Sequence, residues 1–147
     1  MNEELILSAR RYDAPKRILV VIDDKNVSDG LASVLQAIDY KVDFALNLQD
    51  ALERFQGEDF PIALIGDLSV RYEGPGRVDR LKEGHPGIAC VAVSWNGEAG
   101  GDICLAGEWA YDRLRFPGEV HDLIPVLDRC MDRARLRKER ERAADEL

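Results

Sequence analysis

The stretch RILVVIDDKNVSDGLASVL, residues 17–35, decides the fold that we predict for this chain. It contains an unbroken apolar run at residues 18–22, of the kind expected for a parallel strand that is covered on both faces. Asp23 and Asp24 end this run, and apolar residues then recur at helical spacing until about Tyr40. The stretch therefore predicts a buried strand, an acidic turn and an amphipathic helix.

The same alternation of strand and helix repeats about five times along the chain, with short connections. Such alternation predicts an α/β fold, a doubly wound five-stranded parallel sheet with helices on both faces. The further strands are expected at residues 41–44 (near a sheet edge), 62–65, 88–93 and within 110–116 (at an edge). The further helices are expected after Asn47, which suits an N-cap, around Val78 and Leu81, at residues 102–106 and from about Glu119.

The last of these helices is predicted to be long, and Pro117 suits its start. Its apolar stripe is Val120, Leu123, Ile124, Leu127, Cys130, Met131 and Ala134. We expect the stripe up to Leu127 to pack on the sheet, and the rest to pair with the same helix of a second subunit in a homodimer. The predicted organisation is a polar leader (1–16), the α/β domain (17–130) and a charged helical extension or linker (131–147).

Composition narrows the class of protein. A chain of 147 residues with a net charge of −8 fits one domain and lacks the basic face that direct nucleic-acid binding needs. The three cysteines and two histidines are scattered, so core packing is favoured over a disulfide framework or a zinc site. No signal peptide or membrane-length apolar segment is apparent, and we expect a cytoplasmic protein.

Acidic residues follow two of the predicted strands. Asp23 and Asp24 follow the first strand, and Asp67 follows the third. Ligands of doubly wound sheets bind beyond the carboxyl ends of the strands, so these three carboxylates are expected to converge. Converging carboxylates repel one another unless a cation neutralises them, and Mg²⁺ prefers such oxygen ligands. The pattern predicts a magnesium site at which a carboxylate could accept a phosphoryl group.

Four segments carry a resemblance to a known family. RILVVIDDKNVSDGLASVL, IALIGDLSV, VAVSW and DRLRFP resemble, in order, the first strand and helix, the third, the fourth and the fifth strand of CheY-like response-regulator receiver domains. The resemblance covers about residues 17–130 and implies a flavodoxin-like fold. In the family the fifth strand ends in a Lys-Pro pair, and this chain has no lysine there. That absence, the Gly66–Asp67 pair and the long last helix also resemble features of atypical N-terminal domains of sigma-54-dependent flagellar and biofilm regulators.

Carried over by this resemblance, Asp67 is the phosphoacceptor, and Asp23 and Asp24 hold Mg²⁺ together with it. Ser94 corresponds to the residue that hydrogen-bonds the phosphoryl group, and Arg115 is the nearest cation to the position of the family's lysine. The partner that the family implies is a histidine kinase. The chain would then be a regulatory domain and not an enzyme.

The chain departs from the family pattern at several positions. Without a gap, the alignment puts Ile22 at the first acid, Gly66 at the phosphoacceptor and Phe116 at the lysine. Arg115 points away from that position unless a bulge turns it. Two functions therefore stay open: a phosphate-accepting receiver that signals through its last strand and helix, and a degenerate receiver that acts as a phosphorylation-independent dimerisation or interaction domain of a transcriptional regulator. A flavodoxin-like enzyme is disfavoured, because no glycine-rich phosphate loop follows the first strand.

Overall fold

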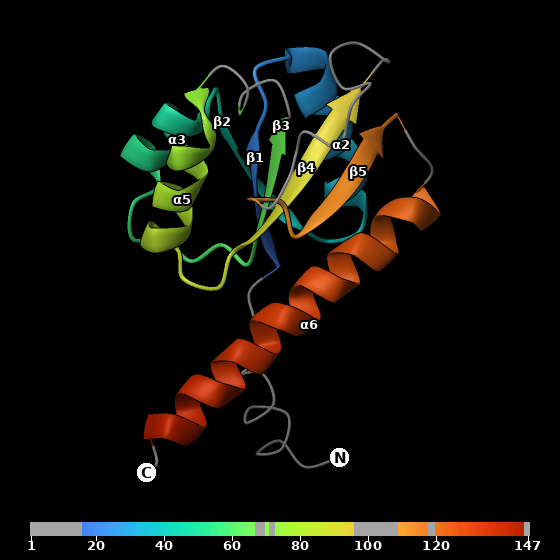
Figure 1. Cartoon of the computed structure of the whole chain (residues 1–147). Helices are drawn as coiled ribbons and strands as arrows, with labels where there is room; N and C mark the ends of the chain where they lie inside the picture. Colours follow the sequence, from blue (N-terminus) through green and yellow to red (C-terminus); the bar gives the residue numbers. More distant parts are fainter. Residues whose placement is uncertain (1–15, 67–69, 71–72, 96–108, 118–119, 146–147) are drawn as a thin grey trace.

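The chain is described by a computed structural model that covers residues 16–66, 70, 73–95, 109–117 and 120–145. Within these residues, parallel strands form one sheet in the order β2-β1-β3-β4-β5 (Figure 1). The strands are β1 (Arg17–Val21), β2 (Lys41–Ala45), β3 (Ile62–Gly66), β4 (Ala89–Trp95) and β5 (Asp112–Phe116). Order and direction confirm the predicted five-stranded parallel sheet, including the edge positions of β2 and β5.

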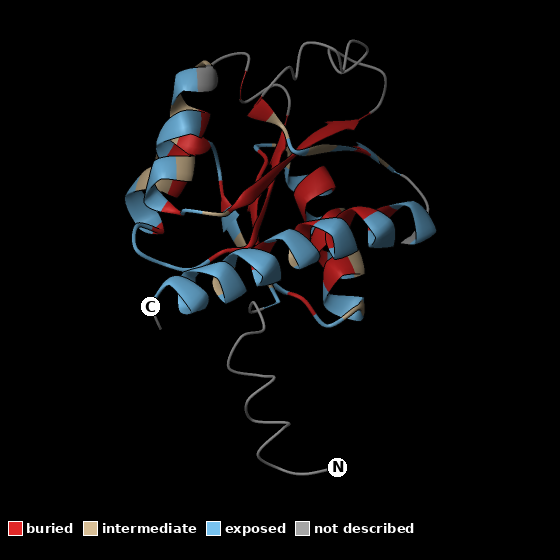
Figure 2. Cartoon of the chain, turned by 60° about the horizontal axis from the view of Figure 1, so that its bottom comes forward, coloured by how far each residue is buried: buried red, intermediate tan, exposed pale blue. Residues whose placement is uncertain are grey.

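Helices cover both faces of this sheet, as the prediction of a doubly wound fold requires. The described helices are α2 (Lys25–Ala37), α3 (Leu48–Arg54), α5 (Pro75–Gly84) and α6 (Val120–Asp145). Apolar residues of α2 and α6 pack with one face of the sheet, and those of α3 and α5 pack with the other. Figure 2 shows the buried strands enclosed by helices that are exposed on their outer sides. The helix expected at residues 102–106 lies outside the described residues.

The strands alternate their side chains between these two cores. Ile18, Val20 and Ile22 belong to the α2/α6 core, whereas Leu19 and Val21 belong to the α3/α5 core. All five side chains are buried, which explains why the run carries no polar residue until Asp23.

The helix starts follow the predicted capping chemistry. The side chain of Asn47 accepts a hydrogen bond from the backbone N–H of Asp50 at 2.8 Å, which confirms Asn47 as the N-cap of α3.

Strand β4 ends at Trp95, two residues beyond the predicted end at Val93, because Ser94 and Trp95 continue the pairing with β5.

The last helix packs on the sheet with one change in its inner face. Leu123 and Leu127 are buried as predicted, but Ile124 is 38% exposed and Val126 is buried in the core instead. The prediction that Ile124 packs on the sheet was therefore wrong. The stripe turns gradually around the helix because an α-helix has 3.6 residues per turn.

Helix α6 is continuous from residue 120 to residue 145, so the predicted boundary at residue 130 falls inside it. Cys130 is fully buried and Ala134 is 7% exposed within a single chain. Both were expected to lie beyond the sheet and to be available for a second subunit. They contact the chain's own core instead, and that expectation was wrong.

Cys90, Cys130 and His85 are buried, whereas His121 is exposed on α6. Burial raises the pKa of the Cys90 thiol to about 11 and that of the Cys130 thiol to about 12. His85 is buried, and its Nδ1 lies 2.6 Å from the carbonyl oxygen of Glu58. Cys104 lies outside the described residues. Among the helices that the structure describes, none is long and apolar enough to cross a membrane.

The packing of α6 generates a stability prediction. Leu127→Ala should lower the free energy of unfolding by about 2–5 kcal/mol, because the side chain is buried in the core. Ile124→Ala on the same helix should lower it by less than about 1 kcal/mol, because this side chain is partly solvated. Urea unfolding of both variants measures the difference, and equal losses would contradict the observed orientation of α6.

Candidate functional site

The candidate site lies at the carboxyl edge of the sheet, where β1 and β3 end side by side. Val21 pairs with Ile65, and Gly66 pairs with Val93 of β4. The residues that follow these pairs are the ones for which the sequence predicts a site. Of them, Asp67 lies outside the described residues, so its predicted role as phosphoacceptor and metal ligand stays a prediction.

The two aspartates after β1 lie at the start of α2. Asp24 is the N-cap of this helix, and its Oδ1 accepts a hydrogen bond from the backbone N–H of Val27 at 3.1 Å. Asp23 is exposed and lies one residue earlier. The structure thus gives Asp24 a local structural role, and the predicted binding of Mg²⁺ by Asp23 and Asp24 stays untested.

Two other acidic side chains at this edge also hold a helix end. The carboxylate of Glu73 accepts hydrogen bonds from the backbone N–H groups of Leu48 and Gln49 at 2.9 and 3.1 Å, and Arg77 donates to the same carboxylate at 2.8 Å. A hydrogen bond from the Leu46 amide lowers the pKa of Asp50. Glu73 therefore caps α3 from a distant part of the chain. Sequence reasoning missed this contact, since no local pattern links residues 25 positions apart.

Apolar side chains occupy the position between the ends of β1 and β3. Ile22 is 3% exposed and Trp95 is 7% exposed, and both belong to the α2/α6 core. A Cβ atom built on Gly66 would lie 3.1 Å from the Trp95 ring and 3.6 Å from Cγ1 of Ile22. The indole therefore lies directly over the backbone of Gly66, where a longer side chain has no room.

Phe116 extends this apolar group to α2. A Cβ atom built on Gly30 would lie 2.6 Å from Cζ of the Phe116 ring, so this ring is in close contact with the backbone of α2. Gly30, which has no side chain, is the residue that admits this ring. We refer to Ile22, Gly66, Trp95 and Phe116 as the apolar wedge.

Ser94 and Arg115 lie on the opposite face of the sheet from the wedge. They pair with each other in an unbroken β4–β5 register, in which Trp95 pairs with Phe116. Ser94 is buried and Arg115 is exposed. Side chains of adjacent residues alternate along a strand, so Arg115 does not replace Phe116 at the wedge, and no bulge in this register turns it.

Within the residues that the structure describes, no group of three or more His, Cys, Asp or Glu side chains is arranged to hold a metal ion. The described acids at this edge act as helix caps, are exposed, or pair with arginine. A magnesium site of the predicted kind therefore depends on Asp67.

Comparison with known proteins identifies the fold. No protein-family model matches the chain. The nitrogen assimilation regulatory protein NtrX of Azorhizobium caulinodans is 26% identical over 125 residues, which cover 83% of this chain and 27% of that protein. The chain thus spans about a quarter of the length of this curated relative.

Solved structures share the fold of this chain. An adenylate cyclase from Rhodopirellula baltica matches with a TM-score of 0.73 and 16% identity, over 90% of this chain and 99% of that one. NtrX from Brucella abortus, in complex with ADP, matches with a TM-score of 0.71 and 23% identity, over 86% of this chain and 28% of that one. A CheY-like response regulator receiver domain protein from Methanospirillum hungatei matches with a TM-score of 0.66 and 23% identity, over 87% and 99%.

A related comparison bears on the metal. The receiver domain of the sensor histidine kinase PA1611 from Pseudomonas aeruginosa, which matches with a TM-score of 0.66 and 19% identity over 81% and 99%, holds a magnesium ion in its active site cleft. The predicted resemblance to CheY-like receiver domains is confirmed, and the chain has the receiver fold.

The close contact at Gly66 generates a second prediction. Gly66→Ala should destabilise the domain by about 1–3 kcal/mol, because the new methyl group meets the Trp95 ring in a closely packed core. Gly76→Ala is the matched control, since no atom lies within 4 Å of a Cβ at that helical position. Its effect should stay within about 1 kcal/mol and favour the folded state. Thermal melts of both variants test this, and equal stability of the two would contradict the contact.

Proposed function

We propose that this receiver-fold domain is a regulatory interaction module that works without an aspartyl phosphate, as part of a transcriptional regulator of the response-regulator type. It is a signalling domain and not an enzyme in this proposal. One observation carries it: the apolar wedge occupies the place where the family's acid, phosphoacceptor and lysine are expected from the ungapped alignment.

The chemistry of phosphoryl transfer supports this choice. The transferred group is multiply charged, and its transfer needs a cation and oriented donors around the phosphoryl oxygens. Ile22, Trp95 and Phe116 offer a methyl-bearing chain and two rings at this place. Burying an unpaired charge against such groups is strongly unfavourable.

The local use of the remaining acids supports the proposal as well. Asp24 and Glu73 satisfy backbone N–H groups at the starts of α2 and α3, where their negative charge also suits the helix dipole. Recruiting Asp24 to a metal would weaken its cap. The magnesium ion in the PA1611 receiver domain favours the opposite expectation, namely that this chain also binds Mg²⁺. Metal binding is therefore tested directly.

The second candidate function is the phosphate-accepting receiver. It rests on Asp67 as phosphoacceptor, with Mg²⁺ held by Asp23, Asp24 and Asp67, a histidine kinase as phosphodonor, and Ser94 and Arg115 as groups that contact the phosphoryl oxygens. The observation in its favour is the receiver fold, together with an aspartate directly after β3.

Partners follow from the proposal and its comparisons. A homodimer through the last helix stays a prediction, and light scattering before and after truncation of the extension tests it. With a net charge of −8, the domain is not expected to bind DNA itself. The NtrX relative is a regulatory protein of which this chain matches only 27%, so any output to transcription belongs to other residues in this proposal. Cytoplasmic residence is part of the same proposal.

A phosphodonor experiment distinguishes the two candidates. The chain is incubated with Mg²⁺ and a small acyl phosphate, and intact-mass spectrometry measures any added phosphoryl group. The proposed function predicts no addition to the wild-type chain, and an unchanged melting temperature in millimolar Mg²⁺, because a metal that binds only the folded state would raise it. A phosphate-accepting receiver assayed in parallel controls for the donor.

Phosphorylation of the wild-type chain would overturn the proposal. If Asp67→Asn removes the added mass, the second candidate is correct with its predicted site. If the added mass survives Asp67→Asn, the chain accepts phosphate at another residue. Both the phosphate-independent proposal and the assignment of Asp67 as phosphoacceptor are then wrong.

A further inference from the structure

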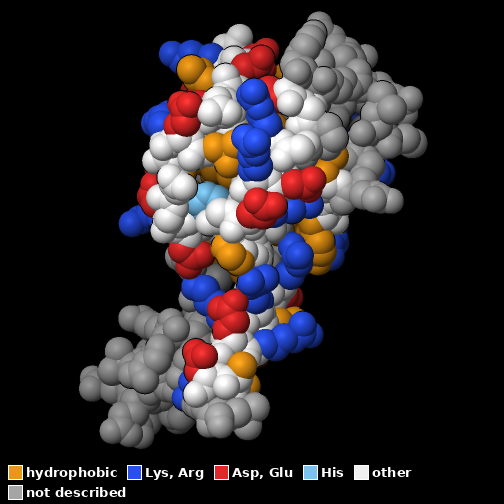
Figure 3. Space-filling model, turned by 60° about the vertical axis from the view of Figure 1, so that its left-hand side comes forward, with side chains coloured by type: hydrophobic (Ala, Val, Ile, Leu, Met, Phe, Trp, Pro, Cys, Tyr) orange, Lys and Arg blue, Asp and Glu red, His pale blue; other side chains and the backbone are white. Residues whose placement is uncertain are grey.

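Helix α6 consists of two halves that contact the rest of the domain differently. The first half is held by the core, through the buried residues Leu123, Val126, Leu127, Cys130 and Ala134. In residues 135–145 every side chain is exposed except that of Lys138, which is partly exposed. The end of the helix that projects at the bottom of Figure 3 accordingly carries mainly charged side chains.

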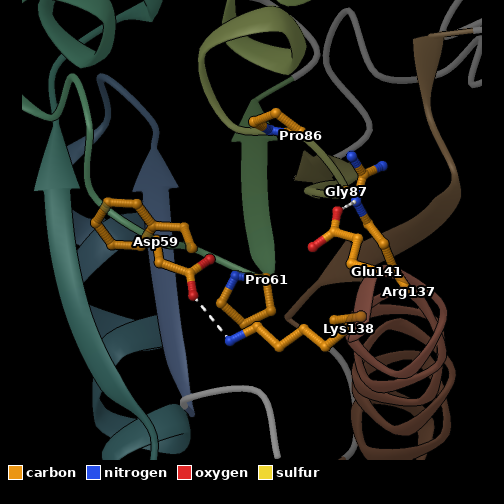
Figure 4. A pocket seen from close by; sticks show the side chains of 9 residues that line it. Asp59, Pro61, Pro86, Gly87, Arg137, Lys138 and Glu141 are labelled. Atoms are coloured by element: carbon orange, nitrogen blue, oxygen red, sulfur yellow. Dashed lines mark hydrogen bonds and ion pairs between the residues drawn. The ribbon is translucent and has the colours of Figure 1, made fainter. Parts of the chain in front are cut away.

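The second half lies over loops at the amino edge of the sheet. A hollow of about 300 Å³ lies under it, lined on the sheet side by Asp59, Phe60 and Pro61 before β3 and by Pro86 and Gly87 before β4. Lys138 bridges this hollow, with its Nζ 3.0 Å from Oδ2 of Asp59 (Figure 4). The helix end is therefore docked across a gap by polar side chains.

Gly87 provides the second point of contact. It has a φ of +87°, and a Cβ atom built there would overlap the aliphatic chain of Arg137 and lie 2.8 Å from its Nε. Figure 4 shows Arg137 beside Gly87, and the Nε of Arg137 donates a hydrogen bond to Oε1 of Glu141 at 3.0 Å. A glycine is therefore needed here for two reasons: the left-handed backbone and the close approach of Arg137.

The loop that receives Lys138 is itself fixed to the sheet. Arg17 at the start of β1 donates to Glu58 at 2.9 Å, and the Nδ1 of His85 lies 2.6 Å from the carbonyl oxygen of Glu58. The guanidinium of Arg17 also lies 4.4 Å from the centroid of the Phe60 ring. Asp59 therefore lies between two residues, Glu58 and Phe60, that Arg17 ties to the start of β1.

These contacts are weak compared with those of the first half. The side chains of Lys138 and Asp59 are 33% and 61% exposed, and an ion pair so exposed shifts an equilibrium by at most about fivefold. A short charged helical segment is marginal in water without packing. Docked and released forms of residues 135–145 are therefore close in free energy, whereas the first half stays anchored.

We propose that residues 135–145 form a releasable latch on the amino edge of the sheet, closed by the Lys138–Asp59 ion pair and by the contact of Arg137 with Gly87. The latch sets the direction and order of the helix end. It goes beyond the proposed function, because it does not depend on whether Asp67 accepts phosphate.

Hydrogen exchange of the full chain, measured by mass spectrometry on peptides from α6, tests the latch. Lys138→Glu should speed exchange of residues 135–145 by roughly two- to fivefold, and adding Asp59→Lys should restore it, because the ion pair is then reversed. Exchange of residues 123–134 should not change in either variant. High salt should act like Lys138→Glu, because it screens exposed charges.

A pair of glycine variants separates the latch from backbone strain. Gly87→Ala should also speed exchange of residues 135–145. Gly57→Ala is the matched control, because its φ of +83° imposes similar strain but no atom lies within 4 Å of its Cβ. Equal effects of the two glycine variants on α6 would overturn the proposal. The proposal would also be overturned if protection of residues 135–145 from exchange were the same in the ion-pair variants and rose with protein concentration. That result would show that a second copy orders the helix end.

Discussion

The contact between the Trp95 ring and the backbone of Gly66 determines what the carboxyl edge of this sheet holds. The two residues lie on adjacent strands, and the ring approaches to within 3.1 Å of where a Cβ would be. Only glycine permits such an approach, so the end of β3 carries no side chain on this face. Ile22, directly after β1, completes the contact, so among the described residues apolar side chains pack where β1 and β3 end, the place at which a doubly wound sheet is expected to bind its ligand.

The wedge also ties together elements that are distant in the chain. Trp95 pairs with Phe116 across β4 and β5, and the Phe116 ring lies on Gly30 of α2. The edge strand β5 is thereby linked to α2 through an apolar contact. Meanwhile the acids nearby cap α2 and α3, which stabilises the two helix starts that border the same edge. The edge is organised for packing and helix capping.

The sequence predicted the parallel sheet, its edge strands and the alternation of strands with helices, because burial on two faces and periodic apolar residues are local signals. It predicted Asn47 as a cap for the same reason. It did not predict the inner face of α6, where Val126 replaces Ile124, since adjacent positions near the rim of a helical stripe are separated only by tertiary packing. The docking of Lys138 on Asp59 and the capping of α3 by Glu73 join residues far apart in the chain, and no local pattern reveals such pairs.

The candidate site was the least predictable part. The ungapped alignment identified Ile22, Gly66 and Phe116 as departures from the receiver pattern, but it gave no reason for them. The reason is steric: the glycines at positions 30 and 66 admit the rings of Phe116 and Trp95, and that complementarity appears only when strands and helix are assembled. The packing of the buried Trp95 ring on Gly66 is likewise not indicated by any local pattern in the sequence.

The most direct measurement of the central claim is a ¹H–¹⁵N NMR titration of the wild-type chain with Mg²⁺ and then with beryllium fluoride, which mimics a bound phosphoryl group. An edge closed by the wedge predicts that the backbone amides of Ile22 and Trp95 and the indole N–H of Trp95 keep their chemical shifts through both additions. Saturable shifts of these signals that require both Mg²⁺ and beryllium fluoride, and that disappear in Asp67→Asn, would contradict the account.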